Sequence, residues 1–260
     1  MQSKKLKSPF GWIGGKSQLS KDIVLMIPPH KTYIEVFGGG LSVFYAKEPS
    51  KLEVINDINS DLINLHRVIR NYPQTLSIYL NKLLISREIF YDIKSQKIKP
   101  KNHIEKAAFY YYLISQSFGS KQDNFAMSAK SGRKPKDIYK DFHQWSKRLK
   151  YTTIENLSFD KLIQLYDKPD SFFYCDPPYY KTESYYKNIG SFGKKEHIKL
   201  YELLSNIQGK FLLSYNDSDF IKSLYKNFYI ISSKEIKYTL AGSNRAKKVS
   251  EIFISNYPLK

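Results

Sequence analysis

The feature that most restricts the fold is a pair of apolar segments joined by three glycines and a helix-forming segment. "TYIEVF" (32–37) and "KLEVIND" (51–57) are rich in β-branched and aromatic residues and predict strands. "GGG" (38–40) predicts a tight turn, and "LSVFYAK" (41–47) predicts the start of a helix. A second helix is expected over 61–69, with apolar residues on one face. Strand, helix and strand in this order form a βαβ unit, which predicts a parallel sheet and an α/β fold.

Later segments return to the strand pattern after a long interruption. Further strands are expected at 171–175, 210–215, 228–236 and 251–257. Between the two groups, 103–118 predicts a helix, and residues 121–150 carry nine Lys or Arg against three Asp. We therefore expect one sheet domain formed by 1–69 and 151–260, interrupted by a helical and basic insert over 70–150.

The charge balance indicates a polyanionic partner. Of 260 residues, 42 are Lys or Arg and 24 are Asp or Glu, which gives a formal net charge of +18. This surplus favours a nucleic acid partner over the alternative of a protein that merely comes from a lysine-rich proteome. The 22 tyrosines include candidates for stacking on bases.

Several other classes of protein do not fit the composition. The single Cys175 rules out an internal disulfide framework and a Cys-rich zinc site, and it fits a reducing compartment. The five histidines show no metal-ligand spacing, so we expect no metal. The polar, basic N-terminus gives no indication of a signal peptide, and no run of 18 apolar residues predicts a membrane span.

The motif "SFFYCDPPYY" ends a predicted buried strand on a carboxylate, Asp176. Pro177 and Pro178 have no backbone N–H and fix φ near about −65°, so the turn is stiff and rich in acceptors. Tyr179 adds an aromatic ring. Such a turn suits a planar ligand with N–H donors, for example the exocyclic amino group of a nucleobase. If strand alternation holds, Cys175 points away from Asp176 and is a small buried residue.

Two N-terminal motifs are candidates for a cofactor site. The glycines 38–40 follow a strand and allow a ligand to approach the backbone, and Asp57 ends the next strand, about 20 residues on. An acid so placed suits a ribose hydroxyl, which favours an adenosine-type cofactor over a plain turn beside a surface acid. "WIGGKS" (12–17) is not a phosphate loop, because position 10 is Phe where that motif needs Gly. Taken alone, it indicates a turn.

In this order, "WIGGK", "EVFGGG", "IND" and "DPPY" resemble the Dam family, the D12 class of adenine-specific DNA methyltransferases. The resemblance spans nearly the whole chain. It implies a Rossmann-like sheet that uses S-adenosylmethionine, with 70–150 as a target-recognition insert in the catalytic domain. It also implies methyl transfer to N6 of a flipped-out adenine in a short specific sequence of double-stranded DNA.

The resemblance also assigns roles to single residues. The residues expected at S-adenosylmethionine are Trp12, Lys16, Phe37, Gly39, Asp57 and Asp176. Those expected in catalysis are Asp176, Pro177, Pro178 and Tyr179, with Tyr179 stacked on the flipped base. One departure is Leu41, where the family usually has glycine. We expect its neighbour Gly40 to compensate by a small shift of the backbone.

Arg133, Lys134 and Lys136 form a basic turn in the insert that we expect to contact DNA, the alternative being a solvated loop. The other expected partner is a cognate restriction endonuclease. We expect a monomer in solution, no membrane association, and action in the cytoplasm of a bacterium or of the bacterial host of a phage.

Two alternatives stay open at this point. The acceptor could be another amino group, such as cytosine N4, RNA adenine or a protein glutamine, although an Asp at the start of the turn favours adenine by resemblance. A catalytically silent DNA-binding module is the other, and the presence of Asp57, Asp176 and Tyr179 argues against it.

Overall fold

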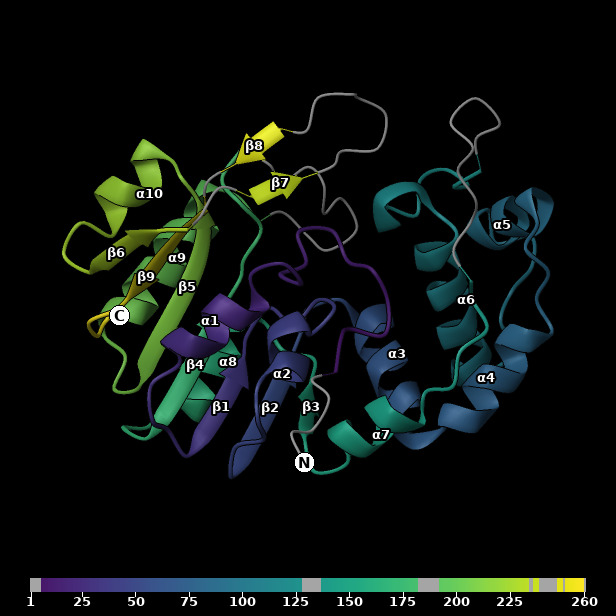
Figure 1. Ribbon diagram of the computed structural model, residues 1–260, viewed down its shortest axis with the longest axis horizontal. Helices are drawn as coiled ribbons and strands as arrows, with labels where there is room; N and C mark the ends of the chain where they lie inside the picture. The colour runs from purple at the N-terminus through teal and green to yellow at the C-terminus, as the bar shows by residue number, and fades with distance from the viewer. Residues whose placement is uncertain are drawn as a thin grey trace.

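A computed structural model describes residues 6–127, 137–181, 192–233, 236–238, 247–249 and 251–259, with the backbone alone given for 236–238 and 247–249. Its centre is a seven-stranded sheet (Figure 1). From one edge to the other the strands are β3 (Thr153–Glu155), β2 (Leu52–Asn56), β1 (Thr32–Glu35), β4 (Ser171–Cys175), β5 (Lys210–Asn216), β9 (Glu251–Ser255) and β6 (Tyr229–Ser232).

The chain builds the sheet outward from β1 in one direction, through β2 and β3, and then in the other direction, beginning with β4. β1 pairs in parallel with β2 on one side and with β4 on the other. At such a point the connections leave the sheet toward opposite faces, and a crevice forms at the carboxyl ends of the strands. The glycine loop that follows β1 and the proline turn that follows β4 therefore border the same crevice.

β9 runs antiparallel to both of its neighbours, β5 and β6. A strand that runs the other way begins where the parallel strands end. Its first residue, Glu251, is consequently paired with Asn216, the last residue of β5. A buried acidic side chain is thereby brought to the edge of the sheet that carries the crevice.

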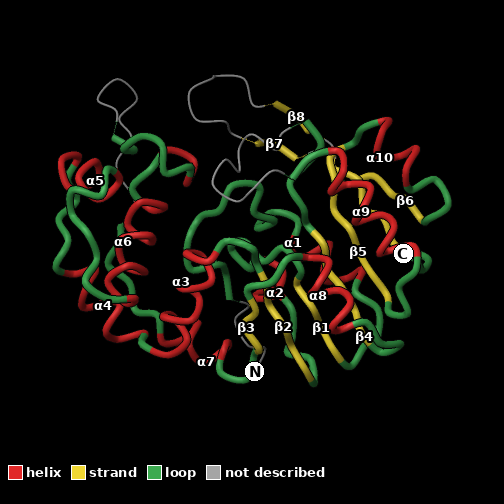
Figure 2. Tube along the Cα trace, turned by 180° about the vertical axis from the view of Figure 1, so that it is seen from behind, coloured by secondary structure: helices red, strands yellow, loops and turns green. Residues whose placement is uncertain are grey.

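Helices cover both faces of the sheet (Figures 1 and 2). One face carries α1 (Ser20–Met26), α2 (Ser42–Ala46) and α3 (Ser60–Asn71), and the other carries α8 (Phe159–Tyr166), α9 (Lys194–Ser205) and α10 (Asp219–Leu224). Side chains alternate along each strand, so Tyr33 packs in the first layer and Ile34 in the second. α3 begins where the Asn59 side chain accepts hydrogen bonds from two backbone N–H groups of its first turn.

The remaining helices lie beside α3, next to the β3 edge (Figure 1). They are α4 (Pro73–Asn81), α5 (Arg87–Lys94), α6 (His103–Ser115), the 3-10 turn η1 (Phe118–Ser120) and α7 (His143–Leu149). Their buried side chains, among them Tyr112 and Leu149, belong to the same hydrophobic cluster as Tyr33 and Ile55 of the sheet. The inserted helices therefore share a continuous core with one face of the sheet.

The α/β class and most expected elements are confirmed. The expected strand over 228–236 is wrong as a single element, because β6 ends at Ser232 and Ile236–Tyr238 (β7) pairs with Lys247–Val249 (β8) in a separate two-stranded sheet. The expected helix over 103–118 ends at Ser115. The three-residue edge strand β3 was not predicted, since so short a run carries no clear alternation.

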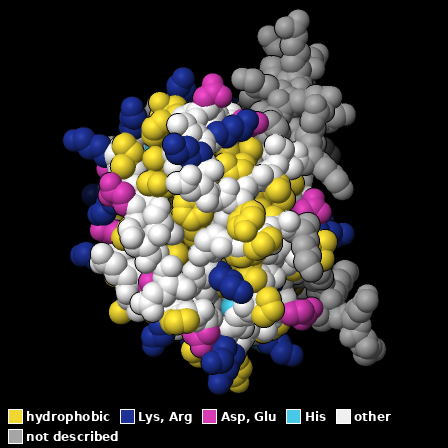
Figure 3. Space-filling view, turned by 90° about the vertical axis from the view of Figure 1, so that its left-hand side faces the viewer, with side chains coloured by type: hydrophobic (Ala, Val, Ile, Leu, Met, Phe, Trp, Pro, Cys, Tyr) yellow, Lys and Arg dark blue, Asp and Glu magenta, His cyan; other side chains and the backbone are white. Residues whose placement is uncertain are grey.

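At one end of the molecule, charged side chains of both signs lie among hydrophobic ones (Figure 3). Figure 3 looks onto the end of the molecule that carries α10 and β6, and there Lys and Arg side chains lie apart from one another with hydrophobic side chains between them. Within the part of the chain that the structure describes, no helix has the length and apolar character needed to cross a membrane.

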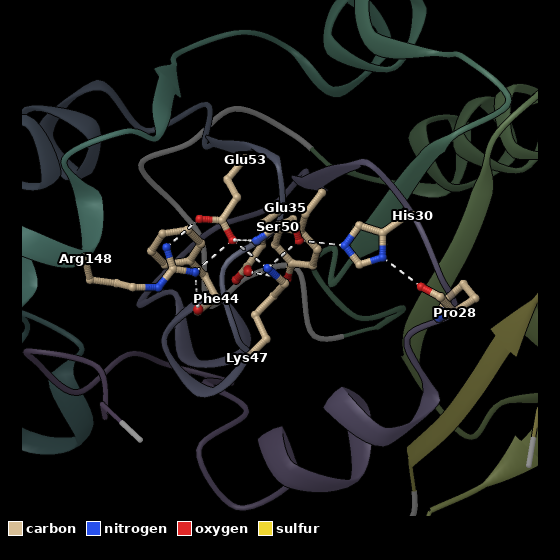
Figure 4. A network of polar contacts seen from close by, with 9 residues as sticks. Pro28, His30, Glu35, Phe44, Lys47, Ser50, Glu53 and Arg148 are labelled. Carbon is tan, nitrogen blue, oxygen red and sulfur yellow. Dashed lines mark hydrogen bonds and ion pairs between the residues drawn. The ribbon is translucent and has the colours of Figure 1, made fainter. Parts of the chain in front are cut away.

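Arg148, on α7, ties the insert to the sheet through a buried ion network (Figure 4). Its guanidinium contacts both carboxylate oxygens of Glu53 on β2, with Nη2 2.8 Å from Oε1, and donates to the carbonyl of Phe44. Lys47 pairs with the same carboxylate. Burial alone would raise the pKa of Glu53, but hydrogen bonds from Arg148 and Lys47 outweigh burial and lower it.

Replacing Arg148 with Met should lower the free energy of unfolding by about 3 kcal/mol, because Glu53 then stays buried with Lys47 as a partner but without the guanidinium. Arg148→Lys, which keeps a charge without the two-pronged contact, should cost less. Because the folded-state pKa of Glu53 is depressed, the loss in R148M should be full above about pH 5 and shrink as the pH falls further.

Urea unfolding of the three proteins at neutral and acidic pH measures these differences. An equal loss at both pH values would assign the effect to packing of Arg148 on the Phe44 ring, whose centroid lies 3.8 Å from the guanidinium carbon, rather than to the ion network.

Candidate active site

The crevice at the carboxyl edge holds a cleft of about 760 Å³, including its open mouth. It is lined by residues from five parts of the chain: the N-terminal loop, the end of β1 with the glycine loop, the end of β2, the end of β4 with the turn after it, and Phe192 before α9. The sequence-predicted residues that line it are Trp12, Lys16, Phe37, Gly39, Asp57, Asp176 and Pro178. Residues that are distant in sequence are therefore brought together around one space.

Gly39 is the residue of the glycine loop that must lack a side chain. Its φ is +50°, and a Cβ built there would lie 2.7 Å from the indole ring of Trp12. Gly38 is nearly as crowded, since a Cβ would lie 2.8 Å from the carbonyl oxygen of Asn56. The loop thus packs its backbone against Trp12 on one side and β2 on the other, and it presents main chain to the cleft.

Leu41 occupies the position where the family usually has glycine. It adopts the left-handed conformation itself, with φ 57° and ψ 37°, and begins α2. Gly40 has no positive φ, so the expected compensation by Gly40 is wrong. The Leu41 side chain is 1% exposed, and its burial in the core offsets a conformation that costs an ordinary residue about 1–2 kcal/mol.

Asp57 closes the cleft at the end of β2. Its Oδ2 accepts the N–H of Gly39 at 2.9 Å, and its Oδ1 accepts the N–H of Asn59 at 2.9 Å. Burial raises the pKa of Asp57, and the backbone N–H donors partly offset this. Each carboxylate oxygen has a further lone pair, so Asp57 could still accept hydrogen bonds from a pair of hydroxyl groups.

Asp176 faces Lys16 across the cleft. The Lys16 ammonium lies 2.7 Å from Oδ1 and 2.8 Å from Oδ2 of Asp176, and it also donates to the carbonyl of Gly14. Burial raises the pKa of Asp176 to about 6, although the charge of Lys16 opposes the rise. The carboxylate is therefore ionised at neutral pH and is protonated in mild acid.

The turn that follows Asp176 consists of Pro177, Pro178 and Tyr179. Pro177 is buried, and the Tyr179 ring lies 4.8 Å from the Lys16 ammonium and 6.1 Å from the ring of Tyr215. Tyr179 does not line the cleft itself, in contrast to Pro178. Cys175 points to the other face of the sheet, is fully buried and has a raised thiol pKa because of burial, as the strand alternation predicts.

Glu35 is a site residue that the sequence did not single out. It lines the cleft from the end of β1 and accepts a hydrogen bond of 2.6 Å from the hydroxyl of Tyr33. Burial raises its pKa to about 8, so it is largely protonated at neutral pH. The sequence signal that could have identified Glu35 is a single acidic residue within an otherwise apolar predicted strand. Phe192 also lines the cleft, beside Phe37.

The predicted DNA contacts Arg133, Lys134 and Lys136 lie outside the described residues. The insert nevertheless reaches the cleft by another route. The hydroxyl of Tyr110, on α6, accepts a hydrogen bond from the Asn59 side chain at 2.9 Å, and Asn59 in turn donates its N–H to Asp57. A hydrogen-bonded chain therefore links the insert to the cleft.

A mostly parallel sheet with a glycine loop, an acid after the second strand and an acidic proline turn is typical of an enzyme of the nucleotide-cofactor class. Comparison with known families makes this specific. The sequence profile of the D12 class N6 adenine-specific DNA methyltransferases matches residues 12–239, and the chain belongs to this family. It is accordingly an adenine-specific DNA methyltransferase that uses S-adenosylmethionine.

Three curated relatives align with this chain over most of their length. The chain is 29% identical to the Type II methyltransferase M.CviBI of Paramecium bursaria Chlorella virus NC1A, over 87% of this chain and 89% of the relative. It is 28% identical to M1.LlaDCHI of Lactococcus lactis subsp. cremoris, over 95% and 94%. It is 29% identical to M.MjaIII of Methanocaldococcus jannaschii, over 95% and 97%.

The donor set of the cleft fits S-adenosylmethionine. Gly39 lines the cleft without a side chain, with its N–H donated to Asp57 and its carbonyl within hydrogen-bond distance of His66 Nε2, and Asp57 keeps acceptor capacity for ribose hydroxyls. Trp12 and Phe37 offer aromatic surface. The Asp176 carboxylate gives a negative charge suited to a sulfonium cation.

We expect Leu41→Gly and Leu41→Ala both to destabilise the protein by about 2–5 kcal/mol, since both remove a buried side chain. Glycine escapes the left-handed penalty that alanine retains, so L41G should be the more stable of the two, the reverse of the order inside a helix. Thermal unfolding of the pair measures this. A more stable L41A would show that residue 41 is not held in the left-handed conformation.

Glu35→Gln keeps an acceptor for Tyr33 and removes a titrating group. The unfolded state ionises near the usual pKa of 4.5, whereas the folded state keeps its proton to about pH 8. The folded state thus binds more protons in this window, and wild-type stability falls as the pH rises across it. The free energy of unfolding of E35Q, relative to that of the wild type, should therefore rise from low to high pH, by on the order of several kcal/mol in all. A constant difference across a urea series would show that Glu35 is not held protonated.

Proposed function

We propose that Asp176 and the turn behind it activate the amino group of the target adenine. An ionised carboxylate accepts an N6 hydrogen, and the carbonyl of Pro177 accepts the other. These contacts direct the nitrogen lone pair into the cleft and stabilise the positive charge that develops on N6. The observation that supports this is the position of Asp176, which lines the cleft at the end of β4 beside the glycine loop.

S-adenosylmethionine supplies an electrophilic methyl group on its sulfonium. We assign Asp57 to its ribose, Gly39 to close backbone approach, and Trp12 and Phe37 to aromatic contact. Lys16 holds Asp176 in the cleft. The rate gain then comes from positioning and fixed charges, with no covalent enzyme intermediate, and the buried, raised-pKa thiol of Cys175 is consistent with that.

The adenine N6 group is paired inside a DNA duplex, so the base must leave the stack, at a cost of a few kcal/mol. We assign Tyr179 to stacking on the extruded base. Its ring lies next to Lys16 and against Tyr215, so rotation away from these neighbours is part of forming the complex. The family match selects adenine N6 in DNA over the other amino acceptors, and an enzyme over a silent binding module.

We assign 1–69 and 151–260 to catalysis and 70–150 to recognition of a short target sequence, with Arg133, Lys134 and Lys136 as DNA contacts. The net charge of +18 supports binding to duplex DNA. Type II names among the relatives support pairing with a restriction endonuclease. A monomer acting on cytoplasmic DNA of a bacterium, or of a phage host, fits this role.

Asp176→Asn keeps the shape of the side chain and removes its charge. It should lower methyl transfer by about 100- to 1000-fold, the range for loss of one fixed electrostatic group. In the wild type, kcat/KM should fall as the pH drops below about 6, where the Asp176 carboxylate is protonated.

Transfer of tritiated methyl groups to DNA measures both effects, with thermal unfolding and calorimetric binding of S-adenosylmethionine as controls. Near-normal turnover by a folded D176N would contradict the assigned chemistry.

A further inference from the structure

Lys16 contacts a second carboxylate besides Asp176. Its ammonium lies 3.8 Å from Oε2 of Glu251, while the distances to Asp176 are 2.7 and 2.8 Å. The Lys16 side chain is 3% exposed and Glu251 is fully buried. Glu251 does not line the cleft, whereas Lys16 and Asp176 do. One buried cation therefore lies between a carboxylate at the reaction centre and a carboxylate behind it.

The position of Glu251 follows from the reversed direction of β9. An antiparallel strand starts at the edge where β4 and β5 end, so its first residue comes to lie near Asp176. An acid in the interior of a protein is costly to ionise unless a cation compensates it. A buried acid at this position therefore calls for a reason, and its proximity to Lys16 provides one.

The proposed chemistry requires Asp176 to change partners. In the structure Lys16 lies within hydrogen-bond distance of both oxygens of Asp176. The same oxygens must accept a hydrogen from the target amine during methyl transfer. A buried ammonium that loosened its contact with Asp176 would need another anion close by, because an unpaired buried charge costs several kcal/mol.

We propose that Glu251 is a positioning residue that takes up the Lys16 ammonium when the Asp176 carboxylate turns to the target amine. This inference rests on the role proposed for Asp176. A small shift of the flexible Lys16 side chain from 2.7 Å contact with Asp176 toward the Glu251 oxygen at 3.8 Å is enough. Glu251 acts through Lys16 and touches neither base nor cofactor.

The titration of Asp176 reports on this arrangement. Among the described residues, the titratable and charged groups that interact electrostatically with it are Lys16, Glu35, Tyr174, Tyr179, Glu251 and, from the other face of the sheet, Cys175. The negative charge of Glu251 raises the pKa of Asp176, and Lys16 lowers it. Loss of the Glu251 charge removes a repulsion on the Asp176 carboxylate and keeps the Lys16 ammonium in contact with Asp176. Both effects lower the pKa of Asp176.

Glu251→Gln tests the proposal, with Glu202→Gln on the exposed surface of α9 as a matched control. E251Q should lower kcat by about 10- to 100-fold, with little change in the KM for DNA. The acid limb of its kcat/KM profile should move to lower pH, while E202Q leaves rate and profile as in the wild type. An unchanged limb with an unchanged kcat would overturn the proposal.

A double-mutant cycle with Lys16→Met separates this role from a purely structural one. Without Lys16, the carboxylates of Asp176 and Glu251 repel each other uncompensated, so E251Q should stabilise the K16M protein in urea unfolding. In the presence of Lys16, E251Q should instead lower the kcat of methyl transfer. An equal loss of stability in both backgrounds would show that Glu251 acts through folding alone.

The same measurements distinguish failure of this inference from failure of the proposed chemistry. If D176N abolishes transfer while E251Q is neutral in rate and pH profile, the positioning role is wrong and the role of Asp176 stands. If a folded D176N remains active, the chemistry itself is wrong.

Discussion

The parallel pairing of β1 with β4 is the constraint on which the rest of the site depends. Glu35 lies opposite Tyr174 in the register, and the N–H of Val36 donates to the carbonyl of Tyr174 at 2.9 Å. The two strands therefore end at the same level. Since their connections diverge beyond that level, the glycine loop and the acidic turn face each other across the cleft. A change of one residue in this register would turn Asp176 to the opposite face of the sheet.

The site concentrates buried charge and backbone strain that a stable core would avoid. Asp176 and Lys16 are paired in a largely enclosed space, Glu35 is held protonated, and Leu41 is left-handed. Each feature has an energetic cost, and the apolar layers on both faces of the sheet offset it. The same features fix charged and polar groups at the cleft in the absence of any substrate, and preorganised groups of this kind are what electrostatic catalysis requires.

The inserted helices are part of this arrangement rather than an appendage. They share a hydrophobic core with one face of the sheet, and Arg148 fixes α7 to Glu53 near the start of β2. At the other end of that strand, the hydrogen bonds from Tyr110 through Asn59 reach Asp57. The helices that we propose for DNA recognition are thus linked through Asn59 to Asp57, whose carboxylate accepts the N–H of Gly39 in the glycine loop.

Local patterns in the sequence were sufficient for the βαβ unit, the α/β class and the residues that end strands. Asp57, Gly39 and Asp176 could be picked out because turn and charge signals follow directly on apolar runs. Trp12 and Lys16 were assigned by family resemblance alone, since "WIGGKS" by itself indicates a turn. Tertiary structure decided the rest. The ion pair of Lys16 with Asp176, the acidic contact of Glu251 and the left-handed Leu41 all depend on strand order, strand direction and packing. These join residues far apart in the chain, and no local spacing encodes such contacts.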